Sequence, residues 1–178
     1  RGDREMIYFD SQGNYAGDWG PTGFARPHGL TISSANEVFC TDDFAHTVNK
    51  YDLDGNLLLA LGTRGVNSDT GAISVDYREI KYSSGPFNYP TNLALAGDGS
   101  FYVSDGYGNA RVHHFTSAGE HLNSWGDPGT KPAQFAVPHD LRIHENGDLW
   151  VADRENDRIQ IFSPDGEFIR LLDGFARP

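Results

Sequence analysis

Two histidines occupy the same place in a repeated pattern of this chain. His28 and His139 each follow a proline directly, in Pro-His-Gly-Leu and Pro-His-Asp-Leu, and Thr91 holds the equivalent place between them. Three imidazoles that leave a fourth coordination position open are typical of a catalytic zinc site. The alternative is a turn that enters a strand, in which each histidine only packs. We expect His28 and His139 to be metal ligands, and the repeat places a third histidine beyond Pro178.

The pattern that contains these histidines is an internal repeat of about 40 residues. Each copy opens with Phe-x-x-Pro and has an aspartate fifteen residues after that proline. A turn glycine follows thirteen or fourteen residues later, and a further glycine closes the copy. Such a repeat indicates stacked supersecondary units. We predict a single domain, 1–178, with repeat copies at 24–62, 87–126 and 135–174, a partial copy at 1–20 and an insertion at 63–86.

Short alternating segments fill each copy, and Gly or Asp-Gly turns separate them. Four such segments per copy, with almost no helical periodicity, are typical of a β-propeller blade. We therefore predict an all-β fold of four-stranded blades. A closed propeller needs at least four blades, so we expect part of a larger ring, completed by a missing segment or a second chain. Histidines two blades apart, with a third two blades further on, suit a six-bladed ring. The predicted strands are 92–96, 101–104, 111–115 and 121–125 in the second copy, and 140–144, 149–152, 158–162 and 168–172 in the third.

The loop after each second strand brings further chemistry to the end of the blades where the histidines lie. Tyr107 and Arg154 follow the repeat aspartates, and counting back from the first turn glycine gives Arg1 the same register as Arg154. Two guanidinium groups can clamp a carboxylate through paired hydrogen bonds, and a tyrosine near a metal and cations can act as a base. We therefore expect Tyr107, Arg154 and Arg1 to be catalytic residues. The alternatives are packing for the tyrosine and a salt bridge to a repeat aspartate for each arginine.

Composition excludes several classes of function. The net charge of −11 argues against nucleic acid and anionic membranes as partners, since both are bound through Lys and Arg. No apolar run approaches membrane length, and the single cysteine, Cys40, excludes an internal disulfide. We expect a soluble protein that acts on a small molecule or a peptide. The compartment stays open, with secreted or periplasmic as the expectation.

Several long motifs, taken together, resemble a known enzyme family. The segments look like NHL repeats, and beyond that they resemble the peptidylglycine α-amidating lyase family, whose motif order they follow over nearly the whole chain. The family is a six-bladed propeller that uses a channel zinc, held by three histidines, to split a peptidyl-α-hydroxyglycine into a peptide amide and glyoxylate. The motifs that carry the resemblance are Arg1–Asp3, Pro27–Leu30, Val103–Arg111, Val137–His139 and Val151–Arg158.

The resemblance implies a role for each candidate residue. His28 and His139 match two zinc ligands, Tyr107 matches the proposed catalytic base, and Arg1 and Arg154 match the active-site arginines. It also implies a structural calcium in the channel, bound in part by a backbone carbonyl. That carbonyl matches Leu30. In a separate departure from the family, Gly108 stands where animal members have a cysteine, so a disulfide there is lost.

The predicted function is therefore a zinc-dependent lyase, and two alternatives stay open. One is a noncatalytic NHL propeller that binds a protein or peptide. The other is a sugar-lactone hydrolase, a class that shares the fold but binds calcium through carboxylate and amide side chains near the axis. The sequence places His, Thr and His at the axial entry instead, which weighs against the hydrolase.

Overall fold

Each repeat copy folds into one four-stranded antiparallel sheet, which confirms the predicted all-β class. The computed structural model describes residues 5–19 and 23–178. Blade 1 contains β3 (Pro27–Ile32), β4 (Val38–Asp42), β5 (Thr47–Tyr51) and β6 (Leu57–Leu61). Blade 2 contains β7 (Pro90–Leu95), β8 (Phe101–Asp105), β9 (Arg111–Phe115) and β10 (His121–Trp125). Blade 3 contains β13 (Pro138–Ile143), β14 (Leu149–Asp153), β15 (Arg158–Phe162) and β16 (Phe168–Leu172).

Smaller elements surround the three blades. An antiparallel hairpin, β1 (Met6–Phe9) and β2 (Tyr15–Trp19), precedes blade 1. The parallel pair β11 (Asp127–Pro128) and β12 (Gln134–Phe135) lies between blades 2 and 3. Two short 3₁₀ helices, η1 (Tyr77–Glu79) and η2 (Arg154–Asn156), are the helical elements of residues 5–19 and 23–178. Within those residues no helix is long and apolar enough to cross a membrane.

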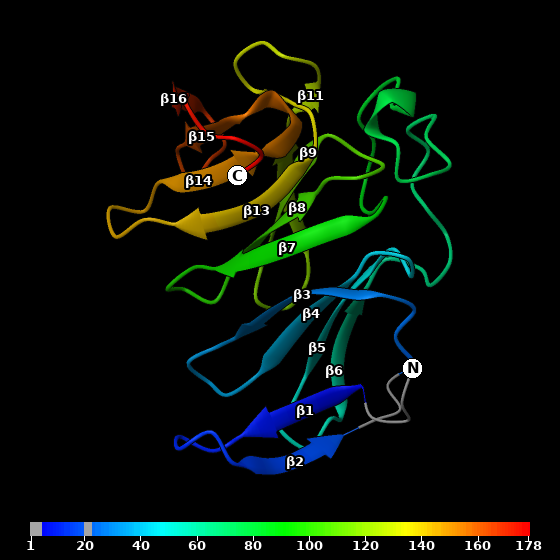
Figure 1. Cartoon of the computed structure of the whole chain (residues 1–178), viewed down its shortest axis with the longest axis vertical. Coiled ribbons are helices and arrows are strands. Elements are labelled where there is room, and N and C mark those ends of the chain that lie inside the picture. The colour runs from blue at the N-terminus through cyan, green and yellow to red at the C-terminus, as the bar shows by residue number, and fades with distance from the viewer. Residues whose placement is uncertain (1–4, 20–22) are drawn as a thin grey trace.

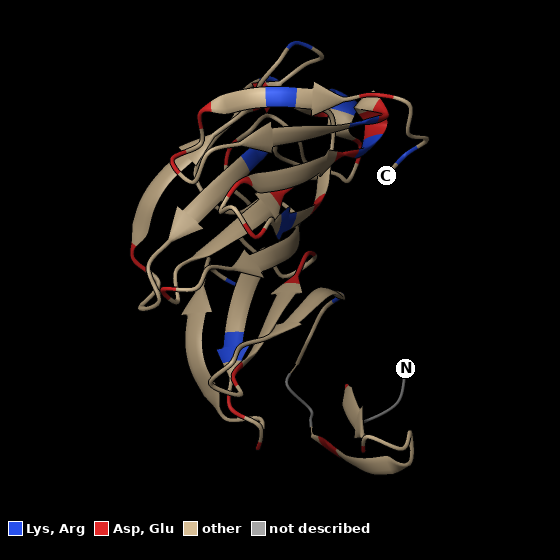
Figure 2. Cartoon of the chain, turned by 90° about the vertical axis from the view of Figure 1, so that its left-hand side faces the viewer, with Lys and Arg blue, Asp and Glu red and all other residues tan. Residues whose placement is uncertain are grey.

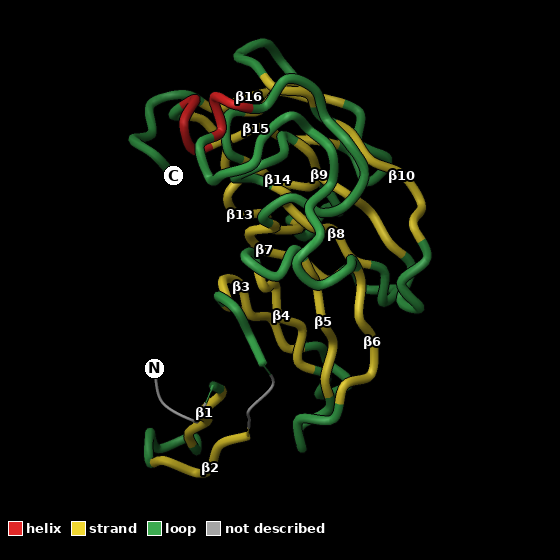
Figure 3. The backbone as a smooth tube through the Cα atoms, turned by 90° about the vertical axis from the view of Figure 1, so that its right-hand side faces the viewer, coloured by secondary structure: helices red, strands yellow, loops and turns green. Residues whose placement is uncertain are grey.

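The blades follow one another along an open arc. Figure 1 shows the first strands of the blades, β3, β7 and β13, side by side, and the contacts between β7 and each of the other two agree with this view. Figures 2 and 3, taken from opposite sides, show the β1–β2 hairpin at one end of the arc and blade 3 at the other. The starts of all three first strands therefore lie at one end of the blades.

Apolar side chains between neighbouring blades form the core. Between blades 1 and 2, Phe39 packs with Phe101 and Phe115, and between blades 2 and 3 buried residues such as Leu141 and Phe162 form a second cluster. Burying each large apolar side chain contributes about 1.5–3 kcal/mol. Alternation along each strand sends these residues to the faces between blades, and this packing fixes how the blades stack.

The repeat aspartates hold the loops in place. Asp42, Asp105 and Asp153 are fully buried. Each accepts a hydrogen bond from the backbone N–H two residues before its repeat proline, at 2.7, 2.9 and 2.7 Å. A buried carboxylate needs such donors, because burial without them is costly. The repeat aspartate therefore ties the end of the second strand to the Phe-x-x-Pro loop.

A β-bulge interrupts the first strand of every blade at the residue after the proline. Pro138 pairs with Asp153 but Asp140 pairs with Ala152, so His139 is the extra residue. The register shifts in the same place between Pro90 and Asn92, and between Pro27 and Leu30. The first strands begin at the proline, two residues before the predicted starts at 92 and 140. The prediction missed this because a bulge breaks the alternation on which it depends.

Candidate functional site

Two bulge histidines and a tyrosine from three different blades converge. His28 lies on β3 and His139 on β13, while Tyr107 lies in the loop after β8. The Tyr107 Oη atom lies 3.2 Å from Nε2 of His28 and 2.9 Å from Nε2 of His139. The two imidazole rings are 5.2 Å apart between centroids and nearly perpendicular. Two ring nitrogens therefore face one position, although a whole blade separates the two strands.

The second ring nitrogen of His28 fixes which nitrogen carries the proton. Nδ1 of His28 lies 2.8 Å from the backbone carbonyl oxygen of Thr91. A carbonyl oxygen only accepts, so Nδ1 must carry the proton and Nε2 keeps its lone pair. A hydrogen bond from the far nitrogen to a carbonyl is the usual support of a metal-binding histidine. Thr91, on the bulge of the middle blade, therefore orients His28 through its backbone.

His139 is held in its neutral form. The pKa of His139 is lowered to about 4, first by burial and then by the neighbouring groups Arg154 and His28. A neutral imidazole has a free lone pair, which both metal binding and hydrogen bonding to a tyrosine hydroxyl require. His139 is therefore an uncharged imidazole near neutral pH.

Arg154 borders the same position. Its Nη1 donates to Tyr107 Oη at 3.4 Å, and its guanidinium carbon lies 5.2 Å from the centre of the Tyr107 ring. Its Nε donates to Glu155 at 2.9 Å, and Arg177 also donates to Glu155 at 2.7 Å. Arg154 therefore pairs with the adjacent glutamate rather than with a repeat aspartate. Its Nε is anchored by Glu155, and its Nη1 faces the Tyr107 oxygen.

The donor set fits two ligands of a metal site. Both Nε2 atoms face a common position, and the nitrogen chemistry suits zinc. Among residues 5–19 and 23–178, no group of three or more His, Cys, Asp or Glu side chains could hold a metal ion by itself. The predicted site residue Arg1 lies outside the described residues. Cys40 is buried, and burial raises the pKa of its thiol to about 12, so it is no thiolate ligand or nucleophile at neutral pH.

Sequence reasoning missed several residues beside this position. Arg26 lies with its guanidinium carbon 5.8 Å from the Tyr107 ring and 3.7 Å from the Phe44 ring, and Tyr89 lies next to Phe44. The signal for Phe44 was present, because Phe44 shares the repeat register of Tyr107. His46 is a buried turn residue that accepts a hydrogen bond from the backbone N–H of Tyr89 at 3.2 Å.

Comparisons with known proteins identify the repeat. The family model described as NHL repeat matches residues 87–115 and 135–162. Mouse "NHL repeat-containing protein 3" is 31% identical over 97% of this chain and 50% of its own length. "Probable peptidyl-alpha-hydroxyglycine alpha-amidating lyase pgal-1" of Caenorhabditis elegans is 34% identical over 79% of this chain and 37% of its own length. Rat "Peptidylglycine alpha-amidating monooxygenase" is 35% identical over 84% of this chain and 15% of its own length.

Solved structures agree on the architecture. A streptogramin B lyase superposes with a TM-score of 0.61 at 18% identity, covering 86% of this chain and 42% of its own. A chain of a nidogen/laminin complex gives 0.67 at 13% identity, covering 97% and 56%. At such identities the likeness shows the fold alone, a β-propeller. This chain spans half or less of the curated relatives described above, and it is an NHL-repeat protein related to peptidyl-α-hydroxyglycine α-amidating lyases and to NHL repeat-containing protein 3.

Proposed function

We propose that this chain carries the catalytic face of a lyase that cleaves a peptidyl-α-hydroxyglycine, or a similar carbinolamide, into an amide and glyoxylate. The observation that carries the proposal is the convergence of His28 Nε2, His139 Nε2 and Tyr107 Oη on one position beside Arg154. The relatedness to enzymes named for this reaction supports the same choice. The proposal is specific, because each group has a role that the reaction requires.

His28 and His139 would hold a zinc ion, whose chemistry when bound is to polarise the substrate hydroxyl oxygen and stabilise negative charge on it. A third ligand would complete the set. The neutral state of His139 and the Thr91 carbonyl behind His28 prepare both imidazoles for this role before any ion binds. Metal content is therefore a direct readout of the site that does not depend on turnover. The structural calcium that the family resemblance implies stays a prediction.

The reaction breaks the bond between the amide nitrogen and the carbinol carbon. Tyr107, as a phenolate, would accept the proton of the substrate hydroxyl as the carbonyl of glyoxylate forms. The electron pair of the C–N bond would leave with the amide nitrogen, which would take up this proton from Tyr107. Arg154 would bind the carboxylate that becomes part of glyoxylate, because its Nη1 already faces the tyrosine oxygen. Arg154 would also stabilise the negative charge that the tyrosine oxygen carries before it accepts the proton. Arg1 would be a second carboxylate ligand.

Glyoxylate release tests the proposal. The complete protein, with the segment or partner that closes the ring and supplies the third ligand, is loaded with zinc, its metal content is measured, and an N-acyl-α-hydroxyglycine is supplied. We expect stoichiometric glyoxylate and amide. His28→Ala should lose bound zinc and activity together, because it removes one of two ligands on the chain. A zinc-loaded wild-type protein that releases no glyoxylate from any such substrate would refute the lyase.

The second candidate is a noncatalytic binding propeller. This chain is also similar to NHL repeat-containing protein 3, whose name states no reaction, at 31% and 32% sequence identity. This similarity favours the binding propeller. A binding module would need no metal, so His28→Ala would leave peptide binding unchanged. A lactone hydrolase is less supported, because the residues at the axial bulges are His28, Thr91 and His139 rather than carboxylates.

A further inference from the structure

One aromatic side chain near the site faces solvent without serving the core. Phe44 is 44% exposed, while the residues on both sides of it, 41–43 and 45–48, are buried. Burying a phenylalanine normally contributes about 1.5–3 kcal/mol, and Phe44 gives up much of that gain. An exposed large aromatic residue in an otherwise buried turn is more informative than an exposed residue on a strand edge. Phe44 is therefore a candidate for contact with a ligand.

The repeat places Phe44 on the same face as the candidate site. Phe44 stands two residues after its repeat aspartate, as Tyr107 and Glu155 do in the other blades. Tyr107 contacts both histidines, and Glu155 anchors Arg154. The three equivalent side chains therefore differ chemically: an apolar aromatic ring in blade 1, a tyrosine in blade 2, and a carboxylate that pairs with two arginines in blade 3.

Arg26 connects Phe44 to the candidate site. Its guanidinium carbon lies 3.7 Å from the Phe44 ring and 5.8 Å from the Tyr107 ring. Its Nε donates to Asp43 at 2.8 Å, so its charge is paired within blade 1. A paired guanidinium offers a flat face for stacking rather than a free charge for a carboxylate. The surface from Tyr107 to Phe44 is therefore continuous and suits flat or apolar groups.

Tyr89 completes this surface in an unusual backbone conformation. Its φ angle is 60°, in the left-handed region that bulky residues rarely adopt. Two hydrogen bonds hold it there, since its N–H donates to His46 Nδ1 and its carbonyl accepts from the Tyr107 N–H at 3.4 Å. Its ring lies 5.7 Å from Phe44 in an edge-to-face arrangement. Val137, directly before the repeat proline of blade 3, has a φ angle of 64°, so this backbone conformation recurs in the repeat and the aromatic ring is what distinguishes Tyr89.

We infer that Phe44, Tyr89 and Arg26 form a subsite for the side chain of the residue that precedes the α-hydroxyglycine, and that this subsite prefers an aromatic or large apolar side chain. The inference rests on the proposed function. The carboxylate end of the substrate points to Arg154 in blade 3, so the acyl end extends across Tyr107 toward blade 1. An extended peptide advances only about 3.3–3.6 Å per residue, so a large side chain on the preceding residue is needed to extend from Tyr107 past Arg26 to the Phe44 ring.

A selectivity ratio tests the subsite. The complete zinc-loaded protein is given N-acetyl-phenylalanyl-α-hydroxyglycine and N-acetyl-alanyl-α-hydroxyglycine, and kcat/KM is measured for each. We expect the phenylalanyl substrate to be favoured ~10-fold or more, the usual worth of a side chain in an apolar pocket. Phe44→Ala should bring the ratio close to one, and Phe44→Tyr should keep it because the ring remains. The matched control is Ile169→Ala, a 47% exposed residue on β16, which should keep the wild-type ratio.

A binding arm separates this inference from the lyase reaction. N-acetyl-phenylalaninamide and N-acetyl-alaninamide, which resemble the amide product, are titrated and followed by NMR. We expect tighter binding of the phenylalanine compound to wild type and no difference in Phe44→Ala. If wild type binds the phenylalanine compound more tightly, Phe44→Ala does not, and no glyoxylate is released, the lyase is refuted and Phe44 still belongs to a site for aromatic side chains. Glyoxylate release with ratios near one in both arms would refute the subsite and leave the lyase standing.

Discussion

At Tyr107, one hydroxyl group contacts two imidazoles and a guanidinium, and this arrangement allows a narrow test of its role. Tyr107→Phe removes only the oxygen and leaves the ring against Arg26 and Arg154. We expect folding and zinc content to stay unchanged and glyoxylate release to fall by roughly 10²–10⁴-fold, the usual worth of a positioned general base. Single-turnover kinetics with a matched thermal melt would measure this. Unchanged turnover would assign Tyr107 to packing.

Arg154 allows a second test at the same scale, because geometry and charge can be separated. Arg154→Lys keeps the positive charge but loses the planar group that bonds Glu155 and faces Tyr107 together. We expect KM for substrates with a free carboxylate to rise about tenfold or more, while substrates with a methyl ester change little. Equal losses for both substrate types would contradict a carboxylate-binding role.

His46 links residue chemistry to the pH dependence of stability. Burial lowers the pKa of His46 below its ordinary value of 6.5. The unfolded chain therefore binds more protons than the folded chain between these two pKa values, and the free energy of unfolding falls as pH drops through 6.5. Urea denaturation at a series of pH values should show this loss. Burial lowers the pKa of His114 and His139 as well, and both act in the same direction.

The control is a variant of His46 that tolerates the same backbone conformation but cannot be protonated. The φ angle of His46 is 57°, and asparagine is among the residues that tolerate this region best. His46→Asn keeps an acceptor for the Tyr89 N–H but cannot take up a proton. We expect this variant to lose less stability than wild type between pH 7 and pH 5. An identical slope for both proteins would show that His46 does not contribute.

At the scale of the elements, turn glycines connect one blade to the next. Gly166 has a φ angle of 87°, and a Cβ atom there would lie 2.5 Å from the Trp125 ring of the preceding blade. Gly55 approaches the Trp19 ring of β2 in the same way. Glycine is required at these turns for two reasons: the backbone has a positive φ angle, and a Cβ atom would collide with the tryptophan ring. The repeated glycine is therefore a packing signal as well as a turn signal.

Gly13 supplies a matched control for this packing. It has a similar φ angle of 82°, but nothing lies within 4 Å of the position of its Cβ atom. Gly13→Ala should cost only the backbone strain, about 1–2 kcal/mol. Gly166→Ala should cost about 1–3 kcal/mol more, the usual penalty of forcing a group into a packed interface. Chemical denaturation of both variants would measure the difference, and equal costs would contradict the packing role.

The sequence predicted the elements well because turn glycines and alternating strands are local signals. It also predicted which loops would meet, since a repeat puts equivalent residues in equivalent places, and Tyr107 lies beside His28 and His139 for that reason. It did not predict the bulges, because the extra residue is visible only in the pairing between strands. Tyr89 was missed because its contacts are with His46 and Tyr107, which are far away in the sequence.

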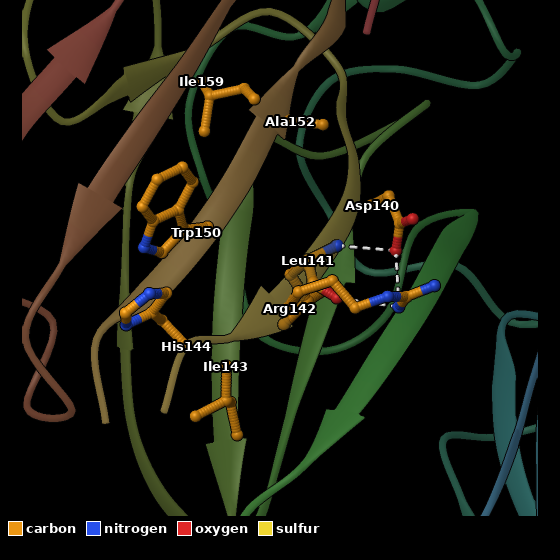
Figure 4. Close-up of a pocket in the computed structure, with 8 residues that line it drawn as sticks. All are labelled: Asp140, Leu141, Arg142, Ile143, His144, Trp150, Ala152 and Ile159. Atoms are coloured by element: carbon orange, nitrogen blue, oxygen red, sulfur yellow. Dashed lines mark hydrogen bonds and ion pairs between the residues drawn. The ribbon is translucent and has the colours of Figure 1, made fainter. Parts of the chain in front are cut away.

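For the whole molecule, the two ends of the arc present apolar faces. Trp150, Ala152 and Ile159 line a hollow on the outer face of blade 3, with Asp140 and Arg142 joined by a hydrogen bond at its edge (Figure 4). At the other end, Ile7 and Phe9 on β1 are 52% and 56% exposed. Such faces are covered by another blade elsewhere in the arc. We propose that a further blade, from the same polypeptide or a second chain, covers them in the complete ring.

The isolated chain should therefore associate through these faces as its concentration rises. The net charge of −11 opposes association at low salt, and moderate salt screens this repulsion without weakening apolar contact, so added salt should promote association. Ile159→Lys places a charge in the hollow and should reduce association, whereas Ile73→Lys, at an 85% exposed site on the insertion, should not. Sedimentation velocity over a wide range of concentration measures this. A chain that stays monomeric at every concentration and salt level would show that the end faces need no cover.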